Sequence, residues 1–97
     1  YQFLKNVILY HHERFDGLGY PLGLQGKQIP LEARIIMTAD VFDALLSKRL
    51  YKDAWDMNEV IHFMRANAGT MFDPECITAL IDNLPEFIQI YHQYQDD

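Results

Sequence analysis

The sequence has 97 residues, of which 49% are hydrophobic and 23% charged, and its formal net charge is −6 at pH 7. This composition is typical of a folded globular chain, and a chain of this length makes one small domain or part of one. The acidic balance argues against a DNA-binding surface, because phosphate backbones are bound by clustered Lys and Arg and only eight such residues are spread along the chain.

The single cysteine, Cys76, cannot form a disulfide within the chain, so the sequence favours a reducing compartment, and we expect the cytoplasm. No apolar run approaches the roughly 18 residues that span a bilayer, so no membrane segment is expected here. The chain begins at Tyr1 inside a helical apolar pattern, without a capping residue before it. We therefore expect a piece of a longer protein.

The first predicted element is a helix over residues 2–11, with Phe3, Val7 and Tyr10 on one face and His11 at its end. Residues 13–28 follow with four glycines and Pro21, and they show little periodicity. This pattern predicts a long loop without regular structure. A loop of this length in a compact domain is usually either functional or mobile.

The rest of the chain shows helical spacing in four further segments. A central helix is expected from Pro30 to Leu46 or Ser47. Its helical spacing is carried by Ile35, Ala39, Phe42 and Leu46. Because no strand pattern is present, the predicted fold class is all-α, a bundle of about five helices with the glycine-rich loop after the first.

Capping residues set the bounds of the last three predicted helices. Asp56 and Glu59 form a capping-box pattern that begins a helix through about Ala68, which Gly69 ends. The next helix begins at Asp73 and Pro74 and runs to about residues 80–83. Pro85 opens the terminal helix, which is expected to reach about residue 94.

Three residues are candidate metal ligands: His11, His12 and Asp40. Neighbours on a helix diverge by about 100°, so two adjacent histidines can share a metal cluster only if the helix ends there or if they serve two ions. Imidazole combined with carboxylate oxygen suits Fe, Mn or Zn. The alternative for the histidines is a surface or capping pair.

Asp40 has Ile36 one turn before it and Ala44 one turn after it, which predicts a carboxylate on an apolar face. An ionised carboxylate is costly there unless it is paired or binds a metal. The alternative is a salt bridge to Arg34 or Arg49. Asp43 could be the ligand instead, or an acceptor that orients a histidine ring.

Arg49 and Lys52 offer a bidentate fork and a point charge for a phosphate group, three residues apart. The alternative for this pair is a solvated basic surface.

Several motifs resemble those of the HD-GYP family. Residues 11–21, HHERFDGLGYP, match its HHExxDGxGYP signature, and residues 39–45, ADVFDAL, resemble its ADVYDAL stretch. Arg49, Tyr51 and Lys52 fall at the family's R-x-Y-[KR] run, and GTMFDP at residues 69–74 is also similar. The resemblance covers residues 1–82, and residues 83–97 form a terminal helix without a motif.

The resemblance implies that residues 1–97 are the C-terminal portion of one HD-GYP domain, with a partial HD-domain fold. Such a domain holds two or three transition-metal ions, with Fe or Mn expected first and Zn or Ni as alternatives. It hydrolyses cyclic di-GMP to pGpG or GMP in bacterial second-messenger signalling.

The resemblance also implies roles for individual residues of this sequence. His11, His12 and Asp40 match metal ligands, and Tyr20, Arg49 and Lys52 match residues that contact the cyclic dinucleotide. The supporting motif positions are Glu13, Asp16, Gly17, Gly19, Pro21 and Asp43.

The His-Asp dyad that names the family, and its earlier ligands, have no counterpart in these residues, so we expect them upstream together with a regulatory domain. The 97-residue chain alone is therefore expected to be inactive. The alternative function is a binding module whose Gly-Tyr-Pro loop docks a diguanylate cyclase or another signalling partner, and a helical packing domain is a third. Apolar faces without a partner, notably those of Phe3, Val7, Ile36 and Phe42, also predict an exposed hydrophobic patch and self-association into a homo-oligomer.

Overall fold

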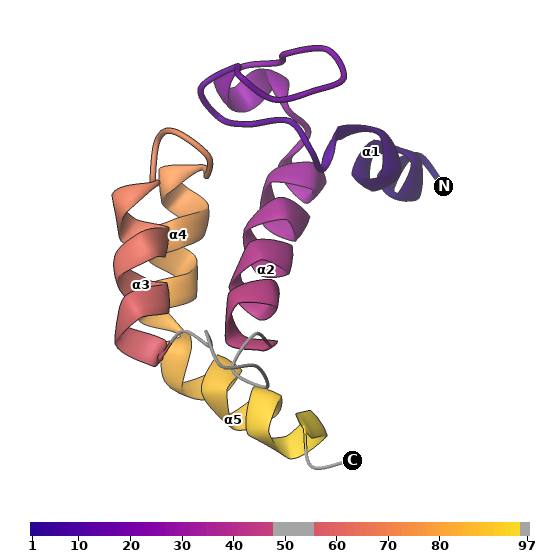
Figure 1. Cartoon of the computed structure of the whole chain (residues 1–97). Coiled ribbons are helices and arrows are strands. Elements are labelled where there is room, and N and C mark those ends of the chain that lie inside the picture. Colours follow the sequence, from indigo (N-terminus) through magenta and orange to yellow (C-terminus); the bar gives the residue numbers. More distant parts are fainter. Residues whose placement is uncertain (48–55, 96–97) are drawn as a thin grey trace.

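A computed structural model of the chain describes residues 1–47 and 56–95. The helices are α1 (Gln2–Tyr10), α2 (Leu31–Ser47), α3 (Met57–Ala66), α4 (Pro74–Asp82) and α5 (Leu84–Gln95), with a short 3-10 helix, η1 (Gly26–Gln28), before α2 (Figure 1). The described residues contain no strand, only two isolated β-bridges. The all-α prediction is thus confirmed. None of the described helices has the length and apolar character needed to cross a bilayer.

Side-chain caps begin α3 and α4 as the sequence predicts. The Asp56 carboxylate accepts the Glu59 amide at 2.8 Å, and the Glu59 side chain accepts the Asp56 amide, which completes the capping box. Asp73 caps α4 through the Glu75 amide at 2.8 Å. Helix α3 ends at Ala66, earlier than the predicted end near Ala68. The backbone and side-chain amides of Asn67 donate to the Phe63 carbonyl at this end of the helix.

The apolar core lies between α2, α3 and α4. Its buried side chains are Phe42, Leu45, Leu46, Val60, Met64, Phe72, Ile77 and Leu80. Since α2 contributes to this core only through its C-terminal half, Phe42 and Leu46 are buried, whereas Ile35 is 48% exposed and Ala39 is also exposed. The expectation that Phe42 lies on an uncovered apolar face is wrong, because α3 and α4 pack against this stretch of the helix.

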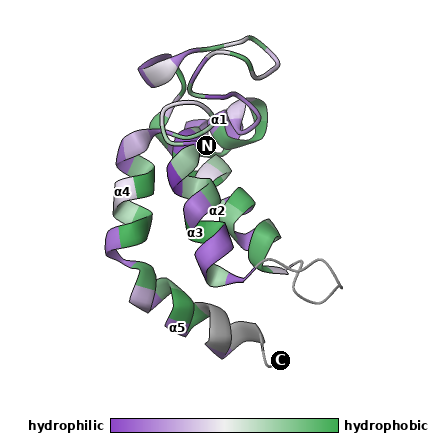
Figure 2. Ribbon diagram, turned by 60° about the vertical axis from the view of Figure 1, so that its left-hand side comes forward, coloured by the Kyte–Doolittle hydropathy of each residue, from purple (hydrophilic) through white to green (hydrophobic). Residues whose placement is uncertain are grey.

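Helix α1 lies beside α2 but buries none of its residues (Figure 1). The Asn6 amide group donates to the Glu32 carboxylate across the two helices at 3.2 Å. Large apolar side chains remain at the surface, among them Phe3 at 61% exposure. Figure 2 shows hydrophobic colouring on α1 as well as on the interior helices. The apolar face predicted for residues 2–11 is thus present, and it is open in this chain.

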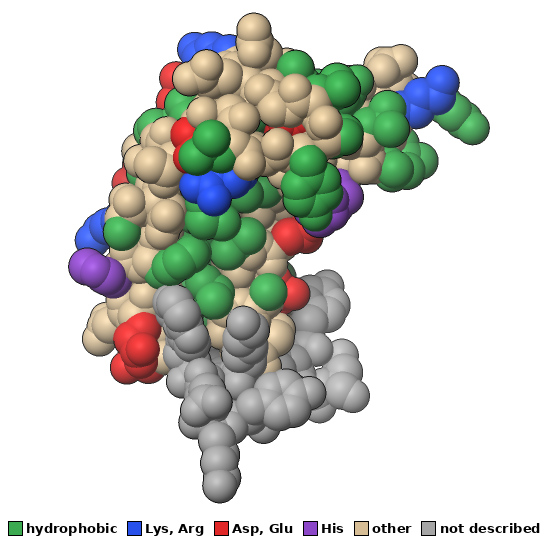
Figure 3. Space-filling model, turned by 45° about the horizontal axis from the view of Figure 1, so that its top comes forward, with side chains coloured by type: hydrophobic (Ala, Val, Ile, Leu, Met, Phe, Trp, Pro, Cys, Tyr) green, Lys and Arg blue, Asp and Glu red, His purple; other side chains and the backbone are tan. Residues whose placement is uncertain are grey.

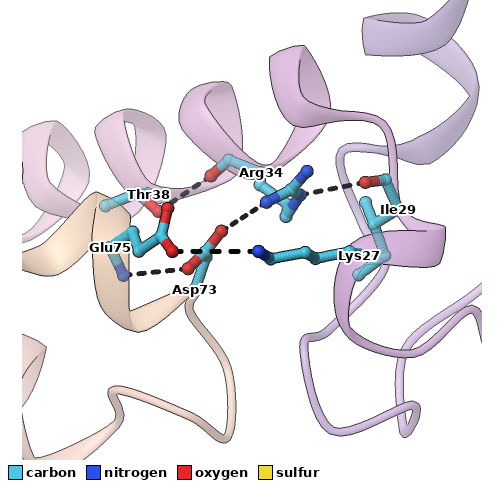
Figure 4. Close-up of polar contacts among 6 residues, drawn as sticks. All are labelled: Lys27, Ile29, Arg34, Thr38, Asp73 and Glu75. Carbon is cyan, nitrogen blue, oxygen red and sulfur yellow. Dashed lines mark hydrogen bonds and ion pairs between the residues drawn. The ribbon is translucent and has the colours of Figure 1, made fainter.

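A buried ion pair fixes the start of α2 against the start of α4 (Figure 4). The Arg34 guanidinium pairs with Asp73, and its Nε donates to the Ile29 carbonyl at 2.9 Å. The Arg34 and Asp73 side chains are only 11% and 3% exposed. Arg34 therefore joins three segments: the end of the loop, α2 and the cap of α4.

Candidate functional site

The two adjacent histidines stand where α1 ends. Tyr10 is the last helical residue, and His11 follows as the C-cap. The His11 Nδ1 atom lies 2.8 Å from the Val7 carbonyl oxygen. Since a carbonyl oxygen can only accept, this hydrogen bond requires a proton on Nδ1, and the neutral ring of that tautomer has its Nε2 lone pair available to a metal. Helix α1 therefore ends at the histidine pair, which is one of the two conditions under which adjacent histidines could share a metal cluster.

The histidine rings lie close to each other and to Tyr20. The ring centroids of His11 and His12 are 4.0 Å apart, and the Tyr20 ring stacks on His12 at 4.9 Å with an interplanar angle of 16°. The Tyr20 amide donates to the His12 carbonyl at 3.3 Å, which brings the loop back over the pair. His12 and Tyr20 are both exposed, so a predicted metal ligand and a predicted substrate contact share one surface.

Asp40 lies on the outer side of α2. Asp40, Asp43 and Ala44 are exposed there and Ile36 is half-buried, so no other described segment covers the carboxylate of Asp40. The alternative partner, Arg34, pairs with Asp73 instead. On the face shown in Figure 3, a surface histidine (purple) and acidic side chains (red) lie along the same edge of the molecule.

The ligand set is not closed within the described part of the chain. Among residues 1–47 and 56–95, no three His, Cys, Asp or Glu side chains form a group that could hold a metal ion. The structure therefore brings His11, His12 and Tyr20 together without completing a site around Asp40. Arg49 and Lys52, the predicted phosphate contacts, lie outside the described residues.

Glu13 is the most deeply buried acidic side chain of the loop, at 2% exposure. Its Oε1 accepts the amides of Leu22 at 2.6 Å and Gly23 at 3.1 Å, and its Oε2 accepts the amide of Leu24 at 2.8 Å. Charge-assisted bonds from three amides offset the cost of burying a carboxylate. In the sequence, Glu13 is only a supporting motif position, and no feature of its spacing predicts these partners.

Asp16 organises the loop at its tip. One carboxylate oxygen accepts the Leu18 amide at 3.0 Å, and the other pairs with Arg14 at 2.9 Å. The Leu18 amide, and then the Arg14 guanidinium, hold the pKa of Asp16 below its ordinary value, because both favour the ionised form. Asp16 therefore supports the loop conformation.

Two of the motif glycines are required for different reasons. Gly17 has a φ of +85°, a conformation that other residues rarely adopt. At Gly19 a Cβ would lie 2.4 Å from the Arg14 nitrogen and 2.5 Å from the His12 carbonyl oxygen. The segment that carries Tyr20 therefore approaches the histidine turn closely only because residue 19 has no side chain. The Tyr20–Pro21 peptide that follows is cis.

The loop of residues 13–28 has more structure than the sequence predicts. Its backbone is joined to the connection between α3 and α4 by the Phe15 amide on the Met71 carbonyl (3.2 Å) and the Asp16 amide on the Thr70 carbonyl (2.8 Å). A β-bridge pairs Asp16 with Gln25, and η1 follows. The prediction of a loop without regular structure is therefore wrong for part of this segment. Backbone pairing does not require a hydrophobic pattern, so the periodicity of the sequence does not indicate it.

Residues 2–76 match the family model described as HD domain. The chain belongs to the HD domain family.

Relatives of this HD domain chain include named phosphodiesterases. It is 52% identical over 88 residues to the cyclic di-GMP phosphodiesterase response regulator RpfG of Xanthomonas campestris pv. campestris, covering 91% of this chain and 23% of that protein. It is 44% identical over 89 residues to the 3'3'-cGAMP-specific phosphodiesterase 2 of Vibrio cholerae, covering 92% and 17%. The predicted resemblance to the HD-GYP family is confirmed.

A solved structure is similar to this HD domain chain as well. The crystal structure of a cyclic GMP-AMP specific phosphodiesterase of V. cholerae aligns with a TM-score of 0.73 and 28% identity, over 91% of this chain and 20% of that one. The HD domain chain spans only about a quarter or less of the curated relatives it matches, at 23% and 21% for two of them.

Proposed function

We propose that the protein containing this HD domain chain hydrolyses a phosphodiester bond of a cyclic dinucleotide, with cyclic di-GMP as the first candidate and pGpG or GMP as product. The observation that carries the proposal is the paired imidazoles of His11 and His12 with the Tyr20 ring stacked beside them. The similarity to named cyclic di-GMP and cyclic GMP-AMP phosphodiesterases supports this substrate class.

Imidazole and carboxylate donors suit transition-metal ions, and from the family we propose two or three of them, with Fe or Mn expected first and Zn or Ni as alternatives. His11 presents a free Nε2 because its Nδ1 is held by the Val7 carbonyl, and hydrogen bonding at one ring nitrogen is the usual way that a metal-binding histidine is oriented. His11, His12 and Asp40 would hold the ions together with ligands from outside this chain. Bound metal supplies an activated water and stabilises negative charge on the phosphodiester.

The chain's own residues supply substrate contacts beside the ions. Tyr20 presents an exposed aromatic ring and a hydroxyl, which can stack on a base and form a hydrogen bond. Arg49 and Lys52 are proposed to contact the phosphates, where Arg offers a planar fork and Lys a point charge.

A second candidate function is a docking module for a diguanylate cyclase or a related signalling protein. The exposure of Leu18, Tyr20 and Leu22 around the Gly-Tyr-Pro turn favours it. Three large side chains on a loop fixed by backbone contacts form a surface suited to protein binding.

The test uses the full-length protein, purified with Mn or Fe and assayed against cyclic di-GMP and 3'3'-cGAMP. We expect turnover of at least one substrate, and loss of metal and of turnover in His12→Ala and Asp40→Ala. His62→Ala, an exposed histidine of α3, is the matched control. A metal-free protein, or turnover unchanged in His12→Ala, contradicts the proposal. Binding to a diguanylate cyclase without turnover favours the docking module.

A further inference from the structure

We infer that Glu13 is a positioning residue for Tyr20, and that it acts by binding three backbone amides of the turn that follows the Gly-Tyr-Pro segment. The inference rests on the proposed function, because it assigns Glu13 a part in placing a substrate contact. We call Glu13 and the amides of residues 22–24 the Glu13 clamp.

The Glu13 clamp joins residue 13 to the backbone of residues 22–24. Glu13 directly follows His12, and its carboxylate is anchored below the surface with 2% exposure. The three amides it binds belong to consecutive residues, at 2.6, 3.1 and 2.8 Å. A carboxylate that accepts three successive amides fixes the path of the backbone there. The turn after Pro21 is thereby held against the histidine turn.

Tyr20 is placed between two such constraints. On one side, Gly19 is in contact with the backbone of His12 and Arg14, and the Tyr20 amide donates to the His12 carbonyl. On the other side, the Glu13 clamp holds residues 22–24. Tyr20 itself is 61% exposed, so little side-chain packing holds its ring over His12. The position of the ring is therefore set by the backbone on both sides, and Glu13 is the only side chain seen to hold the second side among the described residues.

The substitution Glu13→Gln tests this without removing volume. The amide oxygen of Gln can still accept the amides of Leu22 and Gly23. Its NH₂ group, however, would face the Leu24 amide, so that a donor meets a donor. One anchor of three is lost while the side chain stays the same size, and the change should loosen the turn without disturbing the core.

The experiment compares four forms of the full-length metal-loaded protein: wild type, Glu13→Gln, Tyr20→Ala and the double variant. We expect Glu13→Gln to raise KM for the cyclic dinucleotide about tenfold, with kcat within about twofold and unchanged metal content. In the Tyr20→Ala background the same change should alter KM by less than about twofold, since the residue through which Glu13 acts is gone. Glu86→Gln, an exposed carboxylate of α5, is the matched control and should leave all values unchanged.

Three outcomes overturn the inference. Equal effects of Glu13→Gln in both backgrounds would show that it does not act through Tyr20. Loss of metal in Glu13→Gln would show that it acts on the histidines instead. Exchange of the Leu24 amide as slow in Glu13→Gln as in wild type would show that no clamp exists, and this measurement needs no activity. If wild type turns over neither dinucleotide, the proposed function fails, and amide exchange together with the Tyr20 ring resonances still decides whether Glu13 holds the turn.

Discussion

Between α2, α3 and α4, eight apolar side chains fill the interior, whereas in the loop of residues 13–28 the order comes from hydrogen bonds to backbone groups. The first region is held by burial, which is non-directional and shared by many atoms. The second is held by a few directional contacts, each of which fixes a particular stretch of backbone. Changes in the core should therefore lower the stability of the whole chain, while changes in the loop should act on the site.

The largest effect is expected for Phe72→Ala. Phe72 is 1% exposed and meets the Phe63 ring edge to face. Its removal leaves a cavity in the core, so we expect a loss of about 3–5 kcal/mol in the free energy of unfolding. Urea denaturation of the full-length protein or of its isolated domain measures it. Arg65→Ala, at an exposed position of α3, is the control, and a comparable loss there would show that burial does not separate the two kinds of position.

Next in size is Arg34→Met. Breaking this buried pair leaves the Asp73 carboxylate without its partner and removes the bond to the Ile29 carbonyl, so we expect a loss of about 3 kcal/mol. Adding Asp73→Asn should recover part of it, because no unpaired buried charge remains. Lys27→Met serves as the control, since the Lys27–Glu75 pair is exposed and worth less than about 1 kcal/mol. Additive losses in the double variant would mean that the pair is not coupled.

Gly19→Ala should cost less in stability but more in function. The new methyl group would meet backbone atoms of His12 and Arg14, so the turn that carries Tyr20 must move away. We expect a loss of about 2 kcal/mol in stability and a rise in KM with the core intact. Amide exchange mapped along the chain separates the two regions, and faster exchange in α3 and α4 would contradict the prediction.

The smallest effect concerns the pH response of Asp16. Because its pKa is lowered in the folded chain, the contribution of the ionised carboxylate is present above the ordinary aspartate pKa and is lost as the pH falls through the lowered one. We expect the side-chain carbon of Asp16 to titrate by NMR at a lower pH than a free aspartate, and Arg14→Gln to raise that midpoint. A midpoint at or above the ordinary value would contradict the assignment.

The helices were predictable because apolar spacing and capping are local. The pattern Asp56 to Glu59 and the pair Asp73 and Pro74 both mark helix starts that the structure has. The burial of Phe42 was not predicted, because which part of α2 meets α3 and α4 depends on contacts between distant segments.

The site was predictable only in part. The motif located His11, His12 and Tyr20, and the structure places their rings together. The partners of Glu13 and Arg34 were not predicted. Glu13 binds backbone amides, which every residue except proline has, so the identity of residues 22–24 does not indicate the contact. Arg34 pairs with Asp73, which is 39 positions away in the sequence. The metal-binding roles of His11, His12 and Asp40 and the substrate contacts of Tyr20, Arg49 and Lys52 remain predictions.

The Glu13 clamp has a practical consequence for labelling this protein. It binds the main chain of residues 22–24, so the side chain of Leu22, which is exposed, takes no part in it. Residue 22 can therefore carry almost any side chain except proline, which has no amide hydrogen. A fluorescent or spin label attached at a cysteine placed there would sit close to the histidine pair without loosening the loop, and it would report on whatever arrives at that surface.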